Sequence, residues 1–392
     1  MASRLPALDS GAIVSTPSDR FGYYGWPSAC ALPDGRVLVV ASGMRQSHVC
    51  PFGRTVLCIG SARAPAGRGG HRIWSWTPPR VIGDTPLDDR DAGVVRLGDG
   101  TLVVSWFTMH HGERLREAVG SSGNPANALP ARAALDTYAP DVIDRWYGSW
   151  LRTSDDVGDT WGTARRAPVT APHGPIVQPG AERGLLYFGK EFRRDIDGDE
   201  EGSGPIAAFR TSDAGESWTR LGEVPFAADS EPAENQEPHL CVLGGGAMLG
   251  LIRLTATSEE RLGVGGFVDY CMAETYSLDG GHTWSQPDPF AEHGSTPHLL
   301  LHSSGTVIAT YGYREEPYGL RVRLAADTSA DGSGVPLRWS RPYVLRDDGV
   351  DADAGYPATV ELADGSLLTV SYGRHAPGDR NCGLLWVGWQ LP

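Results

Sequence analysis

The chain has 392 residues, of which 51 are glycine, 29 proline and 12 tryptophan, and it carries a formal net charge of -14. The negative charge, with no basic stripe or arm, argues against nucleic acid as a partner, and six cysteines without CxxC spacing indicate neither a zinc site nor a disulfide framework. No stretch approaches the ~18 consecutive apolar residues of a membrane-spanning helix, so we expect no membrane contact and a protein that is either cytoplasmic or secreted without its leader.

A unit of two apolar strands joined by a turn, usually Asp-Gly or otherwise glycine-rich, occurs six times along the chain. The six copies span residues 26–40, 91–106, 174–189, 237–252, 296–312 and 356–372. With two further strands, each unit completes a four-stranded antiparallel blade, and six blades that close into a ring protect their strand edges. We therefore predict an all-β protein, a six-bladed β-propeller formed as one domain by residues 1–392.

The longest step between successive units separates residues 91 and 174, which predicts an insertion in the second blade at about residues 109–145. Its segments 114–119 and 131–137 are candidates for short helices. Long loops on a rigid scaffold are often functional. The insertion is therefore either a lid or substrate rim, or a packing or oligomer contact. The ring itself is expected to close by pairing of the final strand, 384–391, with an N-terminal strand near 12–16.

Three turns share the pattern Ser/Thr-x-Asp-x-Gly-x-Thr/Ser-Trp, at residues 154–161, 211–218 and 277–284. The aspartate and hydroxyl side chains can bond nearby backbone, the glycine can take a positive φ, and the tryptophan can cover the turn. The pattern resembles the Asp-box of the sialidase superfamily. That resemblance implies a stabilising role in the blades and no contact with substrate.

The innermost strand of a propeller blade starts at the mouth of the central channel, so the first residues of six such strands converge on one spot. We call these the mouth residues; they are Trp26, Asp91, the pair His173-Gly174, Glu237, Thr296 and Tyr356. Structural roles alone would leave such positions small and neutral. Titratable side chains that gather in one concavity are instead typical of an active site.

Three of the mouth residues make the resemblance to sialidases more specific. It implies that Asp91 is the general acid/base, Tyr356 the nucleophile and Glu237 its partner. A tyrosine is a poor nucleophile at its usual pKa near 10, so a neighbouring carboxylate must take its proton. Asp91 would protonate the leaving-group oxygen and later activate water. No cofactor or metal is implied.

Sialidases also clamp the substrate carboxylate with three arginines, whose planar forks lysine cannot copy. Arg253 and Arg314 follow the fourth and fifth inner units, as two members of such a triad should. The first blade begins Gly25-Trp26-Pro27, where the family has Arg-Ile-Pro, so the first arginine is missing from its slot. Arg45 is a family-like pocket arginine. This departure leaves sialic acid itself open as the substrate but still favours an acidic sugar.

Several other residues near these positions have two alternative interpretations. His48 and His173 either line the pocket or are structural, whereas His239 and His298 are expected to make structural hydrogen bonds. Trp26 supplies either an aromatic wall for a sugar or a wedge between the first and sixth blades. Asp89 belongs to a solvated acidic loop, or it replaces Asp91 as the acid.

We predict an exo-acting glycoside hydrolase of sialidase type that releases a sialic acid or related ulosonic acid from an acidic oligosaccharide or glycoconjugate. One alternative is another propeller carbohydrate enzyme. It could be a polysaccharide lyase that uses His48 or His173 with Tyr356, or a glycosidase acting on a uronic acid or rhamnose. The other alternative is a non-catalytic glycan-binding propeller. The oligomeric state is not predicted.

Overall fold

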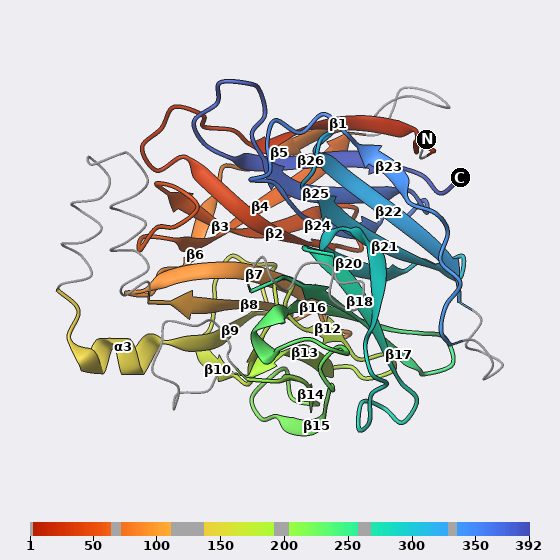
Figure 1. Ribbon diagram of the computed structural model, residues 1–392. Coiled ribbons are helices and arrows are strands. Elements are labelled where there is room, and N and C mark those ends of the chain that lie inside the picture. Colours follow the sequence, from red (N-terminus) through yellow and green to blue (C-terminus); the bar gives the residue numbers. More distant parts are fainter. Residues whose placement is uncertain (1–2, 64–71, 111–136, 192–203, 258–267, 328–334) are drawn as a thin grey trace.

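The computed structural model describes residues 3–63, 72–110, 137–191, 204–257, 268–327 and 335–392, and its strands form six antiparallel sheets (Figure 1). The inner strand of each sheet contacts the next sheet in cyclic order, so that the sheets close into a ring. This arrangement confirms the predicted all-β, six-bladed propeller.

The first three blades, from the inside outwards, contain the following strands. Blade one has β2 (Tyr23–Ala31), β3 (Val37–Arg45), β4 (Arg54–Arg63) and β5 (Ile73–Trp76), with β6 (Arg80–Gly83) also on β4. Blade two has β7 (Asp88–Arg96), β8 (Leu102–Met109), β9 (Gly148–Ser154) and β10 (Arg165–Ala167). Blade three has β12 (Ile176–Val177), β13 (Leu185–Glu191), β14 (Ile206–Thr211) and β15 (Thr219–Glu223), with β11 (Val169–Thr170) also on β13.

The last three blades follow the same order. Blade four has β16 (Asn235–Val242), β17 (Met248–Leu254), β18 (Cys271–Ser277) and β19 (Asp288–His293), preceded by the 3-10 turn η1 (Pro232–Glu234). Blade five has β20 (Ser295–Leu301), β21 (Thr306–Tyr313), β22 (Gly319–Ala326) and β23 (Tyr343–Arg346). Blade six has β24 (Gly355–Glu361), β25 (Leu367–Gly373), β26 (Gly383–Trp389) and β1 (Ala7–Val14).

The N-terminal strand closes the ring as the outermost strand of blade six. β1 pairs antiparallel with β26, with Ala12 opposite Leu385, and the two termini lie on the same side of the molecule (Figure 1). The expected pairing of the two ends of the chain is therefore present, with the N-terminal strand beginning at Ala7. The pairing of β1 with β26 joins the two ends of the chain and so fixes the six sheets around the axis of the ring.

The blades pack face to face because their strands are apolar on both sides. In β3, Val37, Val39 and Ala41 pack with side chains of blade six, whereas Leu38 and Val40 pack with side chains of blade two. All five are fully buried. Full burial of such a side chain stabilises the fold by roughly 1.5–3 kcal/mol. The near-continuous apolar runs in the sequence thus reflect strands sandwiched between neighbouring sheets.

Three turns with one hydrogen-bond pattern join the third and fourth strands of blades two, three and four. In the first, Ser154 Oγ accepts from the Gly158 amide (2.8 Å), and Asp156 accepts from the amide (2.8 Å) and hydroxyl (2.6 Å) of Thr160. These bonds lower the pKa of Asp156 to about 2. Equivalent bonds hold the turns around Asp213 and Asp279. Since antiparallel strands reverse at each turn, these connections lie on the face opposite the mouth.

The predicted insertion in blade two falls between β8 and β9. Its residues 111–136, which contain the predicted helix 114–119 and all but the last residue of 131–137, lie outside the described residues. The described end forms α3 (Pro140–Trp146), anchored where the indole of Trp150 and the hydroxyl of Thr108 donate to the Trp146 carbonyl. Within the described ranges, no helix has the length and apolarity needed to cross a membrane.

Candidate active site

Four of the six inner strands start with a side chain forced into the left-handed backbone region. The φ angles are 54° at Trp26, 47° at Asp91, 45° at Glu237 and 49° at Tyr356, and Gly174 holds the same slot in blade three with 72°. At the four side-chain positions the pairing with the next strand shifts register, as in a β-bulge. A non-glycine residue in this region costs about 1–3 kcal/mol. Because four equivalent positions bear this conformational cost, we infer that their side chains have a functional role.

The bulges bring Tyr356 and Glu237 into direct contact across the mouth. The Tyr356 hydroxyl donates to Glu237 Oε1, and Thr296 Oγ1 donates to Glu237 Oε2 (2.5 Å). Arg253 Nη1 lies 2.5 Å from Glu237 Oε2 and 3.3 Å from the Tyr356 hydroxyl. Side chains from blades four, five and six therefore form one buried, hydrogen-bonded cluster.

The electrostatics of this cluster favour an ionised carboxylate beside a neutral phenol. Burial alone would raise the pKa of Glu237, but Arg253 and the hydrogen bonds from Thr296 and Tyr356 hold it below its usual value. Burial and the Glu237 charge raise the pKa of Tyr356 well above 10. The phenol thus keeps its proton at rest, and the adjacent carboxylate is the group placed to receive it.

Asp91 faces the same well from blade two. Its side chain is buried. Burial and the Glu237 charge are the main causes of the raised pKa of Tyr356, and the Asp91 charge raises it further. The Asp91 charge also adds to the effect of burial on the pKa of Tyr187. A second carboxyl group, from blade two, is therefore close enough to Tyr356 for its charge to affect the phenol.

Two arginines flank the pair on the side of blades four and five. Arg314 donates from Nε to the Ala354 carbonyl (3.0 Å) and from Nη2 to the Tyr372 hydroxyl (3.4 Å). Its guanidinium carbon lies 5.6 Å from the Tyr356 ring centroid. The Tyr270 ring contacts both guanidinium groups, at 4.7 Å from Arg253 and 5.6 Å from Arg314. This aromatic bridge, which the sequence did not indicate, sets the separation of the two positive charges.

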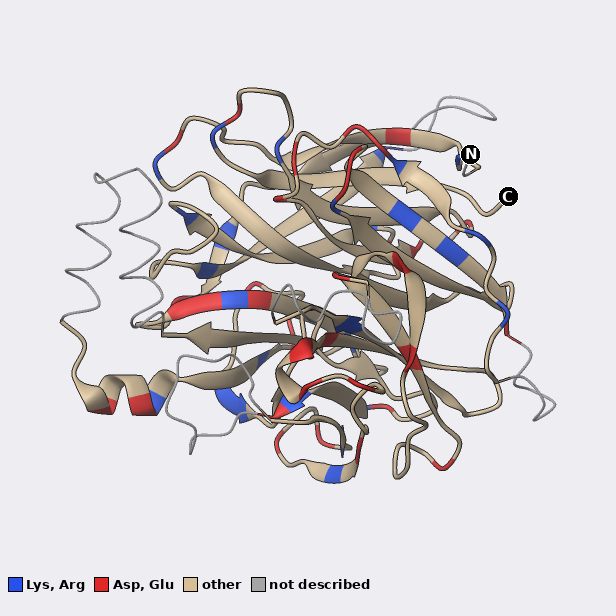
Figure 2. Ribbon diagram, viewed as in Figure 1, with Lys and Arg blue, Asp and Glu red and all other residues tan. Residues whose placement is uncertain are grey.

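The predicted pocket residues of blades one and two are turned towards protein partners. Arg45 is fully buried, and its two Nη atoms bond to the two carboxylate oxygens of Asp88, with 2.8 Å for Nη2. Asp89 is also fully buried and accepts from the amide (3.1 Å) and hydroxyl (2.5 Å) of Thr85. Burial raises the pKa of Asp89 to about 8. The charged run at the start of β7 (Figure 2) is thus largely internal.

Trp26 occupies the mouth position of blade one. It is 1% exposed, with the guanidinium carbon of Arg45 at 4.9 Å and that of Arg90 at 4.1 Å from its ring centroid. Its ring meets those of His48 (4.9 Å) and Tyr356 (6.4 Å) edge-on. The indole therefore wedges between blades one and six, and it leaves little surface for stacking against a sugar.

His173 forms a buried cluster with the two histidines of equivalent strands. Its ring centroid lies 5.3 Å from that of His239 and 5.0 Å from that of His298, and the latter two stack at 4.4 Å. His239 Nδ1 accepts from the Leu299 amide (3.0 Å), and His298 Nδ1 accepts from the Thr359 amide (3.4 Å). No set of three ligating side chains in the described ranges is arranged to hold a metal ion.

We expect the free energy of unfolding to fall as the pH drops below about 6.5, because burial lowers the pKa of all three rings, that of His298 to about 3. The unfolded chain binds protons near pH 6.5 and the folded rings do not, so each ring removes roughly 1.4 kcal/mol per pH unit in that window. Denaturant titrations from pH 7.5 to 5 should show this slope reduced by one ring's share in His298→Gln. The variant His282→Gln, at an exposed position, should keep the full slope; equal slopes in all three proteins would contradict the assignment.

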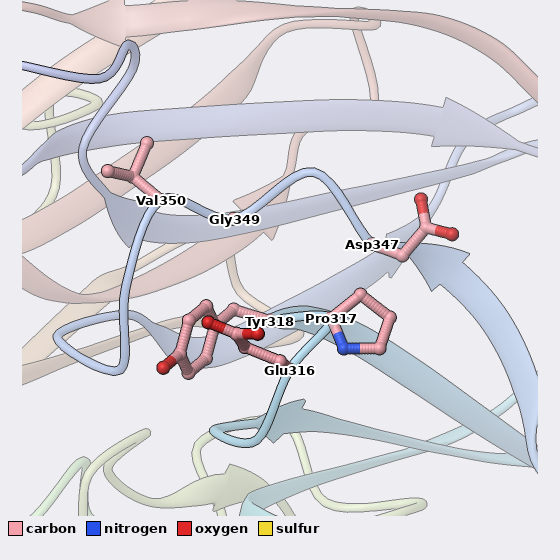
Figure 3. Close-up of a pocket in the computed structure, with 6 residues that line it drawn as sticks. All are labelled: Glu316, Pro317, Tyr318, Asp347, Gly349 and Val350. Atoms are coloured by element: carbon pink, nitrogen blue, oxygen red, sulfur yellow. The ribbon is translucent and has the colours of Figure 1, made fainter.

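A separate hollow of about 540 Å³ lies between the β21–β22 and β23–β24 loops (Figure 3). It is lined by Glu316, Pro317, Tyr318, Asp347, Gly349 and Val350. None of the mouth residues lines it, and its two carboxylates would repel an anionic ligand. The hollow is therefore distinct from the Tyr356–Glu237 cluster.

No model of a known protein family and no curated protein matches the chain. Among solved structures, a protein of unknown function from Dyadobacter fermentans DSM 18053 is similar, with a TM-score of 0.69, 17% identity and 99% coverage of both chains. The intramolecular trans-sialidase from Ruminococcus gnavus gives 0.64, with 13% identity and 98% coverage of both chains. An alpha-L-arabinanase from Penicillium chrysogenum gives 0.57, with 12% identity and 98% coverage of both chains.

These similarities extend over nearly the whole chain, and at such identities they establish the fold. The chain has the six-bladed propeller fold of the sialidases, which it shares with an arabinanase. One of these neighbours is a trans-sialidase and another an arabinanase, so the shared fold does not by itself decide a substrate.

Proposed function

Starting from this sialidase-like fold, we propose that the chain is an exo-acting glycoside hydrolase that releases a terminal acidic sugar, a sialic acid or a related ulosonic acid. The observation that carries the proposal is the Tyr356–Glu237 hydrogen bond beside Arg253, with Asp91 facing it from blade two. A glycan-binding propeller has no need of a phenol bonded to a buried carboxylate. A nucleophile, its base and a separate acid account for Tyr356, Glu237 and Asp91.

The proposed reaction has two steps. The Tyr356 oxygen attacks the anomeric carbon while Glu237 takes the phenol proton, and Asp91 gives its proton to the departing glycosidic oxygen. Water then attacks the anomeric carbon, Asp91 takes a proton from that water, and Glu237 returns its proton to the phenolate as the tyrosyl bond breaks. Two displacements retain the anomeric configuration. A neutral phenol suits an anomeric centre that bears a carboxylate, since a charged nucleophile would be repelled.

The acidic character of the proposed substrate rests on Arg253 and Arg314. Arg253 bonds to the Tyr356 hydroxyl, Arg314 lies beside the Tyr356 ring, and the Tyr270 ring contacts both guanidinium groups. Two such forks can receive a carboxylate attached to the anomeric carbon, whereas a neutral sugar would bring no opposite charge to Arg314, which bonds to the Ala354 carbonyl and the Tyr372 hydroxyl.

Arg314→Ala is therefore expected to raise KM about 10- to 100-fold for anionic aryl glycosides, the range for loss of a charge-assisted hydrogen bond, and to change KM little for neutral ones. Steady-state kinetics on matched pairs of substrates measures this. Arg323→Ala, which removes an arginine of blade five that pairs with Glu292, is the control and should leave both KM values unchanged. Equal effects of Arg314→Ala on anionic and neutral substrates would remove the carboxylate clamp.

A panel of aryl glycosides tests the proposal as a whole. It should contain sialic acid, KDN, Kdo and uronic acid derivatives, with release of the aryl group and the anomeric configuration of the product followed together. Hydrolysis with retention on an ulosonic acid is expected. A new ultraviolet absorbance from an unsaturated uronide would instead identify a lyase, and binding without any product would identify a glycan-binding propeller.

A further inference from the structure

His48 is held at the mouth between blades one and six by a partly buried hydrogen-bond network. Its Nδ1 lies 2.9 Å from Asp353 Oδ1, and the Tyr23 hydroxyl donates to the same oxygen at 2.9 Å. The side chain of His48 is 44% exposed and that of Asp353 is 24% exposed. One edge of the imidazole is thus fixed by the protein, while part of the ring is open to solvent.

The backbone of His48 is fixed as firmly as its ring. Arg45 Nη2 donates to the His48 carbonyl at 3.0 Å, and Arg90 Nη1 donates to it at 3.3 Å. Both guanidinium groups also contact the Trp26 ring, against which the imidazole packs edge-on. A solvent-accessible side chain with so many restraints is built to present one atom in one direction.

The partner of Nδ1 determines which ring nitrogen of His48 carries the hydrogen. An ionised carboxylate can only accept hydrogen bonds, so Nδ1 carries the hydrogen and Nε2 keeps its lone pair. Burial lowers the pKa of His48, with Arg90 and Arg45 acting in the same direction, although Asp353 opposes them. At neutral pH the open side of the ring therefore offers a hydrogen-bond acceptor.

The same network reaches the proposed substrate clamp. The Tyr372 hydroxyl donates to Asp353 Oδ1 (3.3 Å) and lies 3.4 Å from Arg314 Nη2. The Tyr372 ring centroid is 5.9 Å from that of Tyr356. His48 and Arg314 are thus linked through Asp353 and Tyr372, and Arg314 and Tyr372 both lie beside the Tyr356 ring.

We propose that His48 binds the substrate by accepting a hydrogen bond at Nε2 from a hydroxyl group of the sugar, and that Asp353 is its positioning residue. This inference rests on the proposed function, because it places a sugar ring over Tyr356. It deepens that function by dividing recognition between blades. Blades four and five bind a carboxylate, and blade one, where Gly25 stands in the slot of the first arginine of sialidases, binds a hydroxyl.

Two probes separate these contributions. N-acetylneuraminate carries a carboxylate and hydroxyls, whereas tetrahydropyran-2-carboxylate carries the ring and carboxylate alone. His48→Ala should weaken binding of N-acetylneuraminate about 10- to 100-fold, the range for loss of a hydrogen bond in a polar site, and leave the second probe unchanged. His48→Gln, which can place an amide oxygen near the Nε2 position, should restore most of the affinity. Both variants keep the backbone carbonyl that Arg45 and Arg90 bind.

Asp353→Asn tests the positioning role through the tautomer. Nitrogen-15 NMR of the His48 ring should show an unprotonated Nε2 in the natural protein and a shift of the proton towards Nε2 in this variant, with a loss of N-acetylneuraminate affinity similar to that of His48→Ala. An unchanged tautomer would overturn the role given to Asp353.

The outcomes distinguish this inference from the proposed function. Equal weakening of both probes by His48→Ala, or no change in either, would overturn the reading of a hydroxyl. If Arg314→Ala changes neither probe while His48→Ala weakens only N-acetylneuraminate, the carboxylate clamp fails and the His48 contact stands.

Discussion

Tyr356→Phe is expected to lower kcat by at least about 10³-fold, the scale on which loss of a catalytic nucleophile is felt, while the fold stays intact. Only the hydroxyl that bonds to Glu237 is lost. The phenyl ring keeps its packing against Trp26 and Tyr372, at centroid distances of 6.4 and 5.9 Å. Steady-state kinetics on the best substrate of the panel, with the thermal unfolding midpoint measured alongside, provides the result.

Tyr372→Phe is the matched control for this experiment. It removes a hydroxyl from a neighbouring buried tyrosine whose bonds run to Asp353 and Arg314. Because that hydroxyl orients groups but does not touch Glu237, the loss in kcat should be far smaller. Full activity of Tyr356→Phe would remove Tyr356 as the nucleophile, and equal losses in both variants would indicate that packing or hydrogen bonding, and not attack by the phenol, is responsible.

The fold could be predicted because it is repeated. Each unit pairs an apolar strand with another across a short turn, and six copies leave few ways to bury every strand on both faces. The convergence of Tyr356 with Glu237 follows from the same register, since equivalent positions of all the blades meet at the axis. The left-handed backbone at these positions had no signal, because tryptophan, aspartate, glutamate and tyrosine rarely adopt it.

Contacts outside the repeat could not be predicted. Arg45 has the residue type of a pocket arginine, but whether its fork faces a ligand or a carboxylate such as Asp88 depends on packing between blades one and two. Asp353 and Tyr270 lie on connections that follow no repeat, and Asp353 meets His48 from 305 positions away in sequence. Thr296 occupies a mouth position, so the repeat pattern could have predicted its hydrogen bond to Glu237.

Asp91→Ala is expected to show a loss that depends on the leaving group. General acid catalysis contributes about 10²- to 10⁴-fold, and this should be lost in kcat/KM for substrates with a natural sugar leaving group. An aryl leaving group with a low pKa departs without protonation, so its glycosylation step should be nearly unaffected. The second step then lacks its base and becomes rate-limiting, and a small anion such as azide should restore kcat by attacking in place of water.

Asp89, which also lies at the start of β7, supplies the control that separates the loss of proton transfer from the loss of a charge. Asp89 is fully buried with its pKa raised to about 8, so at pH 7 it is largely protonated and Asp89→Asn closely mimics it. That variant should lower activity equally little for natural and activated leaving groups, and azide should not affect it. If Asp91→Ala instead slows both classes of substrate alike, the acid is not Asp91, and if Asp89→Asn shows the leaving-group dependence, Asp89 takes that role.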